Sequence, residues 1–285
     1  MEKRQYLRFL TINTKIDNSE TFGMNLQDYE KMKYLLGNPY GIIYITGPTG
    51  SGKTTTLYMA IEKLAKRAVN ISTIEDPVEK NINRINQMQV NVQAGLTFTT
   101  GLRALLRQDP DIILVGETRD VETASISVSA ALTGHLVLST LHTNDAVSTI
   151  ARLVNMGVDN YMIANAVKGV VAQRLVRKIC TNCKEEYIPT NEEKAMLGKN
   201  VDKLYRGKGC HVCNNTGYKG RQAIHEIFVV DKQVVKMISS KAPIEQIYDY
   251  AINNLKMHTL YNSMTELVEK GITTTEELKR ISYNI

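Results

Sequence analysis

The chain of 285 residues carries a formal net charge of +6 and contains 43% hydrophobic and 22% charged residues, the composition of an ordinary globular protein. Its longest apolar runs, such as Ile42–Ile45 and Ile112–Val115, have the length of strands, well short of the roughly 18 apolar residues of a membrane-spanning helix. The first residues, Met1–Phe9, are charged and lack the apolar core of a signal peptide. We therefore expect a cytoplasmic protein, with a peripheral membrane contact left open.

The excess positive charge is concentrated in one segment. Between Lys168 and Arg221 the chain has twelve Lys or Arg and five Asp or Glu. This segment is either a solvated basic face or a docking patch for an acidic partner or a membrane surface. No basic motif interleaved with aromatic residues accompanies it, so we expect no nucleic-acid partner.

Residues 1–38 are predicted to be the remnant of an upstream domain and its linker. Short alternating pieces near Tyr6 and Phe9 precede a predicted helix, Asn25–Leu36, which Gly37 and Pro39 end.

Residues 39–178 alternate between apolar strand-like runs and amphipathic helices. This alternation predicts an α/β fold, with βαβ units around a mostly parallel sheet. The predicted strands are Ile42–Ile45, Asn70–Ile74, Ile112–Val115 and Leu136–Thr140. The predicted helices are Lys53–Lys66, Phe98–Arg107, Val121–Leu132 and Ala146–Met156.

Two smaller regions are predicted to follow the core. Residues 179–228 form short polar segments around four cysteines and are expected to be a zinc-binding module. Residues 229–285 are predicted to be helical, with amphipathic patterns over Ile244–Leu255 and Thr275–Ile281.

A phosphate-binding loop follows the first predicted strand of the core. The residues Gly47, Pro48, Thr49, Gly50, Ser51, Gly52, Lys53 and Thr54 match the pattern G-x-x-x-x-G-K-[ST] in full. Glycines let the backbone N–H groups turn toward phosphates, the lysine reaches the β- and γ-phosphates, and the threonine hydroxyl binds Mg²⁺. A strand before the loop and a helix after it complete the expected context. The sequence therefore predicts an ATP and magnesium site here, which we extend to Thr55.

Polar residues stand just beyond each of the other predicted strands. Glu75 and Asp76 follow the second strand, Glu117 follows the third and His142 follows the fourth. Because ligands of a parallel sheet bind at the carboxyl ends of its strands, we expect Glu75, Glu117 and His142 near the phosphates as catalytic residues. His142 is expected to sense the γ-phosphate. His135, just before the fourth strand, either shares this role or is an ordinary packing residue.

The third strand departs from the usual Walker B pattern. Gly116 stands where an aspartate that reaches Mg²⁺ is usual, and Glu117 follows it. Glu117 must therefore serve the metal, activate water, or alternate between these roles, and Glu75 is the other carboxylate available to orient water. Spacing and composition do not separate the two roles.

Several motifs together resemble one protein family. They are GPTGSGKTTTLY (Gly47–Tyr58), TIEDPVE (Thr73–Glu79), GLRALLRQDPD (Gly101–Asp111), GETRD (Gly116–Asp120) and TGHLVLSTLHTN (Thr133–Asn144). In this order they are similar to the Walker A, Asp-box, Walker B and His-box motifs of the secretion ATPase superfamily. The resemblance implies that residues 39–178 form a RecA-like P-loop ATPase core.

The cysteines and the residues after them indicate the branch of that superfamily. Cys180-x-x-Cys183 and Cys210-x-x-Cys213, followed by Asn215–Arg221 and Ile224–Glu226, resemble the assembly and export ATPases of type IV pili and type II secretion. The resemblance implies a homohexameric motor at the cytoplasmic face of the membrane, docked on an inner-membrane platform protein. We favour type IV pilus assembly, with type II secretion as the alternative.

The family resemblance also extends to the N-terminal residues. The stretch Gln5–Leu10 is similar to the last strand of the domain that precedes the motor in this family. Arg8 would then be an arginine finger that reaches an ATP site, although the family's companion arginine on an earlier strand is absent. The alternative is an exposed strand residue.

All four cysteines of the chain lie in the two C-x-x-C pairs. Four thiolates suit a closed tetrahedral Zn²⁺ site with a structural role, and we expect His211 to be exposed and not a ligand. The other interpretation is four free thiols.

Two other functional classes remain as alternatives. A nucleic-acid motor on a RecA-like core would use the basic segment, but the cysteine pairs disfavour it. A nucleotide-binding scaffold without hydrolysis would fit the glycine at position 116, although Glu75 and Glu117 are both present.

Overall fold

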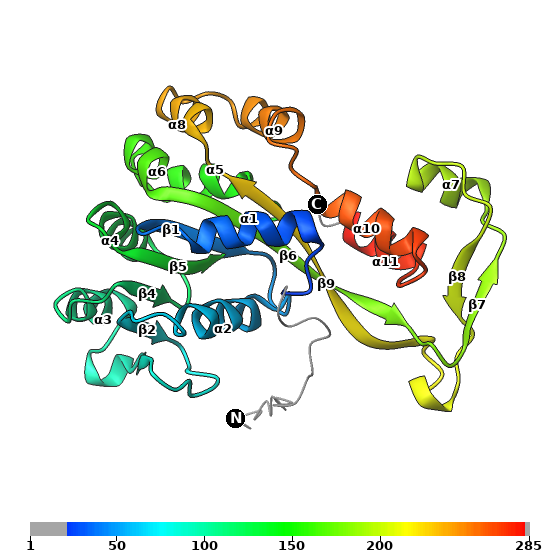
Figure 1. The fold of residues 1–285 in the computed structure, drawn as a ribbon, viewed down its shortest axis with the longest axis horizontal. Helices are drawn as coiled ribbons and strands as arrows, with labels where there is room; N and C mark the ends of the chain where they lie inside the picture. Colours follow the sequence, from blue (N-terminus) through cyan, green and yellow to red (C-terminus); the bar gives the residue numbers. More distant parts are fainter. Residues whose placement is uncertain (1–21, 283–285) are drawn as a thin grey trace, which may run out of the picture.

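The computed structural model describes residues 22–282 and places a seven-stranded sheet at the centre of the molecule, with helices on both faces (Figure 1). The strands of this sheet are β1 (Gly41–Thr46), β2 (Ile71–Glu75), β3 (Asn86–Gln89), β4 (Ile112–Val115), β5 (Leu136–Leu141), β6 (Val167–Ile179) and β9 (Tyr218–Val229). They lie in the order β3-β2-β4-β5-β1-β6-β9. All neighbours are parallel except β6 and β9. The predicted α/β fold with a mostly parallel sheet is thus confirmed.

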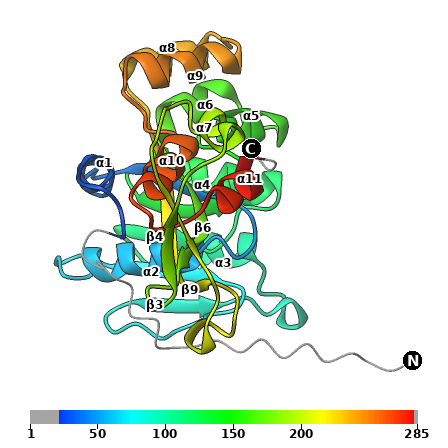
Figure 2. The ribbon, with the colours of Figure 1, turned by 90° about the vertical axis from the view of Figure 1, so that its right-hand side faces the viewer.

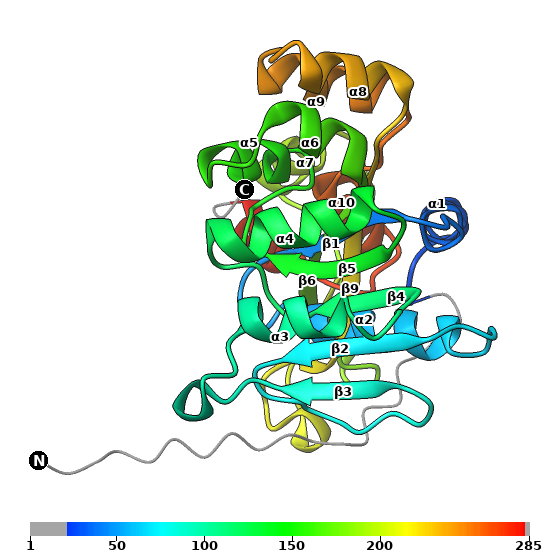
Figure 3. The ribbon, with the colours of Figure 1, turned by 90° about the vertical axis from the view of Figure 1, so that its left-hand side faces the viewer.

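Parallel pairing brings the carboxyl ends of β1, β2, β4 and β5 to one edge of the sheet. Ile74 of β2 is opposite Val115 of β4, which is opposite Ser139 of β5. On the other side of β5, Thr46 is opposite Leu141. The segments that follow these strands therefore begin next to one another, as Figure 3 lets the reader follow for β2, β4 and β5.

The first helix of the core precedes β1, and the others lie between the strands in the sequence. They are α1 (Leu26–Leu36), α2 (Lys53–Leu64), α3 (Phe98–Leu105), α4 (Val121–Leu132), α5 (Ser148–Asn155) and α6 (Asn160–Ala166), with a 3₁₀ turn η2 at Val92–Ala94. Side chains at their first turns set where several of them begin: Asn25 accepts from the Asp28 N–H and Asp120 from the Thr123 N–H.

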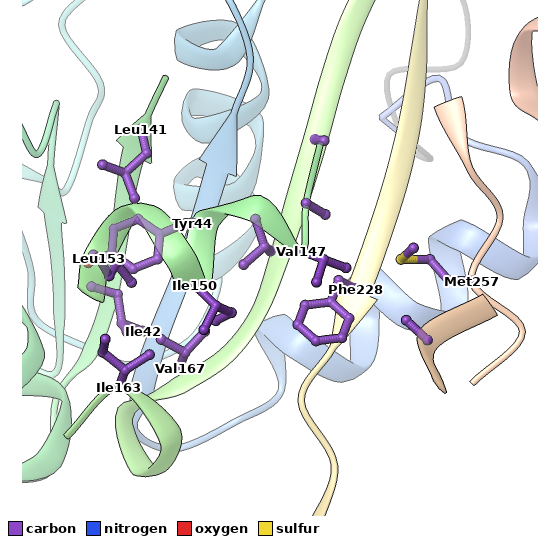
Figure 4. Packing of buried hydrophobic residues seen from close by; sticks show 14 of the residues in the cluster. Ile42, Tyr44, Leu141, Val147, Ile150, Leu153, Ile163, Val167, Phe228 and Met257 are labelled. Carbon is purple, nitrogen blue, oxygen red and sulfur yellow. The ribbon is translucent and has the colours of Figure 1, made fainter. Parts of the chain in front are cut away.

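Alternation along β1 divides the buried side chains between two cores. Ile42 and Tyr44 join a cluster with α3–α6, whereas Ile43 and Ile45 join a second cluster with α1 and α2. Successive side chains of a strand point to opposite faces, so one fully buried strand supplies both cores. Figure 4 shows Ile42 and Tyr44 beside Ile150 and Leu153 of α5.

The strands and helices expected from the sequence are confirmed to within a few residues. Three strands of the main sheet are found where none was expected: β3, β6 and β9. The strand β6 carries Gln173, Arg174 and Arg177 within its apolar run, so it lacks a clean alternation. The strand β9 begins among polar and glycine residues, which are typical of loops.

The cysteine-rich region is an insertion between the far ends of β6 and β9. It contains β7 (Lys184–Tyr187) paired antiparallel with β8 (Leu204–Gly207), the helix α7 (Asn191–Leu197) and the 3₁₀ turn η3 (His211–Cys213). Figure 1 shows this module beyond the end of the sheet. The stretch of residues 218–228, predicted as part of the module, belongs to the main sheet within β9, and the four-part domain division stays a prediction.

The last part of the chain is helical, as predicted. Its helices are α8 (Lys232–Ser239), α9 (Ile244–Asn253), α10 (Leu260–Glu269) and α11 (Thr275–Ser282). Figure 2 shows α10 and α11 next to each other, at the side of the molecule where the cysteine module lies. Among the helices of residues 22–282, none has the length and apolarity that crossing a membrane requires.

Charged residues of the basic segment form ion pairs instead of one uniform patch. In the module, Arg206 lies 2.9 Å and Lys208 2.7 Å from carboxylate oxygens of Glu185. Lys203 pairs with Glu186 at 3.1 Å, and Lys199 pairs with Glu269 of α10 at 2.8 Å. These contacts fit the prediction of a solvated charged face.

Candidate nucleotide and metal sites

The phosphate loop lies between β1 and α2, and its conformation depends on glycine. Gly47, Gly50 and Gly52 have φ angles of 145°, 79° and 88°, values that side-chain-bearing residues rarely adopt. Gly52 is the N-cap of α2 and offers no side-chain cap to the helix. The first N–H groups of α2 can therefore donate to an anion at this end of the helix.

Lys53 extends over the loop that precedes it. Its Nζ donates to the carbonyl oxygens of Gly47 at 2.8 Å and Pro48 at 3.1 Å. Burial lowers the pKa of Lys53, the charge of Glu117 offsets part of this effect, and Arg174 adds to it. A phosphate would supply the negative charge that suits this half-buried cation. Thr54 is half-buried and Thr55 exposed at the same helix start.

Glu117 and His142 are brought together, as expected for residues that follow adjacent strands. His142 Nε2 lies 2.9 Å from Glu117 Oε1. Glu117 Oε2 accepts from Arg119 Nε at 2.7 Å and lies 2.6 Å from Arg119 Nη2. Burial favours the neutral carboxyl group, but Arg119 and His142 outweigh it, so the pKa of Glu117 lies below its usual range. The sequence prediction missed Arg119, although it lies in the same GETRD motif.

Glu75 lies at the end of the strand adjacent to β4, but its carboxylate is buried and has its own partners. Thr73 Oγ1 donates to Oε1 at 2.6 Å and Gln87 Nε2 at 3.1 Å, while the Tyr58 hydroxyl donates to Oε2. Glu75 and Glu117 therefore occupy different environments in this structure: one is enclosed by neutral donors, the other is paired with cations.

The glycine at position 116 has a steric explanation. A Cβ at Gly116 would lie 3.3 Å from both the Glu75 Cα and the Ile74 carbonyl oxygen. The Gly116 N–H donates to that same oxygen at 2.8 Å. The close approach of the two strand ends thus disfavours the aspartate that is usual there.

Two residues of β6 that the sequence prediction missed lie next to the phosphate loop. Gln173 Nε2 donates to the Ser51 carbonyl at 2.8 Å, and Gln173 Oε1 accepts from Thr56 Oγ1 at 2.8 Å. Arg174 is buried, and its Nη2 donates to the Asn144 carbonyl at 2.9 Å. Two adjacent polar residues inside an apolar run were the available signal in the sequence.

The two histidines around β5 lie at opposite ends of that strand. His142 is at the nucleotide edge. His135 precedes β5, and its Nδ1 lies 3.0 Å from the carbonyl oxygen of Ala130 in α4. Its position agrees with the packing interpretation of His135. Arg8 lies outside the described residues.

The four cysteines converge, and their geometry fits zinc. The Sγ atoms of Cys180, Cys183, Cys210 and Cys213 all lie within 4.8 Å of one another. The separations are 3.9 Å for Cys180–Cys210, 3.8 Å for Cys183–Cys213 and 3.7 Å for Cys210–Cys213. Four sulfurs at ~2.3 Å from a tetrahedral zinc would be about 3.8 Å apart. His211 is exposed and is not among the clustered groups within residues 22–282.

Glycines allow the segments around the cysteines to approach closely. A Cβ at Gly207 would lie 2.1 Å from the Gly217 carbonyl oxygen, and one at Gly209 would lie 2.8 Å from that of Asn215. The Asn182 side-chain amide donates to Cys210 Sγ at 3.4 Å, and this bond, together with contacts to Cys213 and Val212, lowers the pKa of Cys210 to about 6. Burial acts in the opposite direction on Cys183 and raises its pKa to about 12. Thiolates are the form that binds zinc.

A protein-family model described as "Type II/IV secretion system protein" matches residues 2–280 of this sequence. The chain belongs to this family. The resemblance seen in the sequence motifs is thereby confirmed. Type II secretion system ATPase E of Vibrio cholerae is 43% identical over 283 residues, which cover 98% of this chain and 56% of that protein. Type IV pilus assembly ATPase PilB of Thermus thermophilus is 46% identical over 285 residues, which cover 97% of this chain and 32% of that protein.

Solved structures of the family share the fold. The pilus retraction motor PilT with bound ADP superposes with a TM-score of 0.72 at 27% identity, covering 95% of this chain and 68% of that one. The ATPase DotB of Legionella pneumophila gives a TM-score of 0.65 at 25% identity, covering 90% and 63% of the two chains. This chain spans about half the length, or less, of the two curated relatives named above.

Proposed function

We propose that this chain is the motor region of a type IV pilus assembly ATPase, which hydrolyses Mg-ATP to drive pilin polymerisation. The observation that carries the proposal is the complete phosphate loop beside the Glu117–His142 pair at one edge of the sheet. A type IV pilus assembly ATPase is 46% identical to this chain, and a type II secretion system protein of Pseudomonas aeruginosa has the same identity. The proposed assembly is a homohexamer docked on an inner-membrane platform protein, at the cytoplasmic face of the membrane.

The proposed roles of the site residues follow from their chemistry. Residues 47–55 bind the phosphates through backbone N–H groups, and Lys53 contributes the positive charge. Thr54 and Glu117 hold Mg²⁺, which neutralises charge on the phosphates when bound. Glu75 orients the attacking water once it exchanges one of its present donors. His142 reports the γ-phosphate, and we retain Arg8 as the proposed arginine finger.

We further propose that Cys180, Cys183, Cys210 and Cys213 bind one structural Zn²⁺ ion. Four protein ligands fill a tetrahedral site and leave no position for water. The sulfur separations support this assignment. The metal would then join the ends of β6 and β9 to the module that they carry.

The second candidate function is the type II secretion ATPase, since a relative with that name is 43% identical over 98% of this chain. Deletion of the chromosomal gene separates the two. Loss of surface pili with secretion intact supports pilus assembly, whereas accumulation of secreted proteins in the periplasm with pili intact supports type II secretion.

Lys53→Ala tests the nucleotide site. Removal of the ammonium group aimed at the phosphates should lower ATP turnover by about a hundredfold or more while the chain stays folded. Phosphate release and circular dichroism measure the two quantities. Lys66→Ala, at an exposed lysine just past the same helix, is the matched control and should keep wild-type turnover. A folded Lys53→Ala chain with wild-type turnover would refute the site.

A further inference from the structure

Arg174 of β6 lies between the phosphate loop and a second buried charge. Its side chain is 5% exposed, and within the described residues its Nη1 has no hydrogen-bond partner. A Cβ at Gly47 would lie 3.3 Å from this Nη1 and 2.7 Å from Ser51 Oγ, which is also buried without a partner. Two unpaired polar atoms therefore face the first glycine of the phosphate loop.

The second buried charge is Glu226 of β9. Ala172 of β6 is directly opposite Glu226, so Arg174, two residues further, lies on the same face of the strand pair as a diagonal neighbour. Burial lowers the pKa of Arg174, and the charges of Glu226 and then Asp145 offset part of this effect. Burial raises the pKa of Glu226 to about 7, Asp145 adds to this rise, and Arg174 opposes it. The two side chains therefore interact electrostatically in a buried environment.

Glu226 connects two segments that are distant in the sequence. Its Oε1 accepts from the Ala146 N–H at 2.8 Å, in the segment after His142, and its Oε2 accepts from the Leu260 N–H at 3.1 Å. Leu260 is the first residue of α10. Further along, α10 reaches the cysteine module, where the Tyr261 hydroxyl donates to the Met196 carbonyl and Glu269 pairs with Lys199.

We propose that Arg174 and Glu226 are positioning residues that transmit the occupancy of the phosphate loop to the start of α10, and through α10 to the cysteine module. This inference rests on the proposed function only in requiring that the loop binds a triphosphate. Arg174 is one cation that serves the bound phosphates on one side and the carboxylates of Glu226 and Asp145 on the other. Binding of a triphosphate leaves the buried carboxylate of Glu226 less well neutralised, which favours its protonation and weakens its bond to the Leu260 N–H.

The experiment measures amide hydrogen exchange over residues 259–264 of the zinc-loaded chain, with and without Mg²⁺ and the nonhydrolysable analogue AMP-PNP. In the wild type, the analogue should speed exchange at Leu260 by about fivefold or more. Arg174→Gln should abolish this response and weaken binding of the analogue, measured by fluorescence. Glu226→Gln should abolish the response because a neutral amide no longer competes for Arg174.

The matched control is a second arginine on the same strand. Arg177 lies 2.8 Å from the buried carboxylate of Glu277 in α11, and its contacts do not include the phosphate loop. Arg177→Gln should lower the melting temperature but keep the exchange response at Leu260. Arg174→Lys retains the charge and should recover part of the response. This variant therefore shows whether the response is lost in Arg174→Gln through loss of the charge or through misfolding.

The outcomes distinguish a failure of this link, the proposed coupling from the phosphate loop through Arg174 and Glu226 to Leu260, from a failure of the proposed function. A wild-type chain that binds AMP-PNP without any change at Leu260 overturns the link, as does a full response in folded Arg174→Gln. A chain that binds and shows the response but does not hydrolyse ATP overturns the proposed function and leaves the link standing. A chain that binds no analogue overturns both.

Discussion

At the scale of single residues, the two carboxylates at the nucleotide edge have opposite surroundings. Glu117 is paired with Arg119 and His142, whereas Glu75 is enclosed by the hydroxyl and amide donors of Tyr58, Thr73 and Gln87. A carboxylate held by cations is ionised and suited to a metal ion. A buried carboxylate with neutral donors can exchange one of them for water. This contrast supports the proposed division between metal binding and water activation.

Glutamine substitutions test that division. Glu75→Gln keeps the shape and removes the charge, so ATP should still bind while turnover falls by about a hundredfold or more. Glu117→Gln should also slow hydrolysis, with a marked rise in the Mg²⁺ concentration required. An Mg²⁺ titration of ATP binding and single-turnover hydrolysis measures both. Wild-type hydrolysis by Glu75→Gln, or a raised Mg²⁺ requirement in that variant alone, would show the roles to be misassigned.

Arg119 gives a prediction for the pH dependence of hydrolysis. Burial raises the pKa of Glu117, and Arg119 is the larger of the influences that lower it. Arg119→Gln should therefore raise this pKa and move the acidic limb of the turnover profile to higher pH, which a pH series of ATP hydrolysis rates measures.

The control for Arg119 is Arg103. It forms an ion pair with Glu122 at 3.0 Å, and its side chain is 61% exposed, as is that of Arg119. Arg103→Gln should leave the acidic limb unchanged. Equal shifts in the two variants would mean that overall charge, and not the contact with Glu117, sets the profile.

At the scale of elements, the strands β6 and β9 join the two candidate sites. Gln173 and Arg174 of β6 lie next to the phosphate loop, and the last residue of this strand, Ile179, precedes Cys180, the first of the four clustered cysteines. The strand β9 begins five residues after Cys213 and carries Glu226 further along. A rigid pair of strands therefore spans the distance between the nucleotide edge and the cysteine cluster.

Serine substitutions in either cysteine pair test the zinc site. One equivalent of zinc should co-purify with the wild-type chain, and Cys180→Ser with Cys183→Ser should remove it and lower the melting temperature, because metal binding contributes to folding. Cys210→Ser with Cys213→Ser should have the same effect, and the quadruple variant should be no less stable than either double. Elemental analysis without zinc in freshly purified, reduced protein would contradict the site, as would additive losses of stability.

At the scale of the whole molecule, the N-terminal helix α1 is fixed to the C-terminal region through a buried polar cluster. Asp28 of α1 lies 3.8 Å from His258 Nδ1, and Ser263 of α10 lies 3.1 Å from the same nitrogen. Ser263 Oγ also donates to the carbonyl oxygen of His225 in β9 at 2.9 Å. This cluster makes the fold sensitive to protonation.

The buried His225 should make the folded state less stable in acid. Burial lowers its pKa from 6.5 to about 4, and Asp28 offsets part of that effect. Below pH 6.5 the unfolded chain takes up a proton that the folded chain does not, so this group reduces stability as the pH falls from 6.5 toward 4. At pH 5 the loss is about 2 kcal/mol.

His225→Gln removes the titrating group. Denaturant unfolding at pH 8 and pH 5 should show a smaller loss of stability in this variant than in the wild type. Comparing the two pH values within each protein cancels any packing effect of the substitution. An equal loss in both proteins would mean that other groups set the acid sensitivity. His258 changes stability in the opposite direction as the pH falls. Asp28 first, and then Glu266, raise the pKa of His258 by more than burial lowers it, so its protonation favours the folded state.

The sequence by itself determined the features that depend on local pattern and on contiguous motifs. The alternation of strands and helices from residue 39 onward, the glycines of the phosphate loop and the spacing of the two cysteine pairs could be read directly, because each depends on residues close together in the chain. Parallel pairing then placed Glu117 and His142 at one edge, since strand direction alone brings those ends together.

Only the tertiary structure decided which distant residues complete the sites. Gln173 and Arg174 follow the phosphate loop by more than a hundred residues, and they reach it because β6 pairs with β1. The donors around Glu75 and the steric reason for Gly116 likewise depend on neighbouring strands and helices. The two hydrogen bonds that Glu226 accepts, from the Ala146 and Leu260 N–H groups, depend on how the helices dock. Side-chain burial and charge compensation are set by contacts between segments far apart in the chain, and no local pattern in the sequence records them.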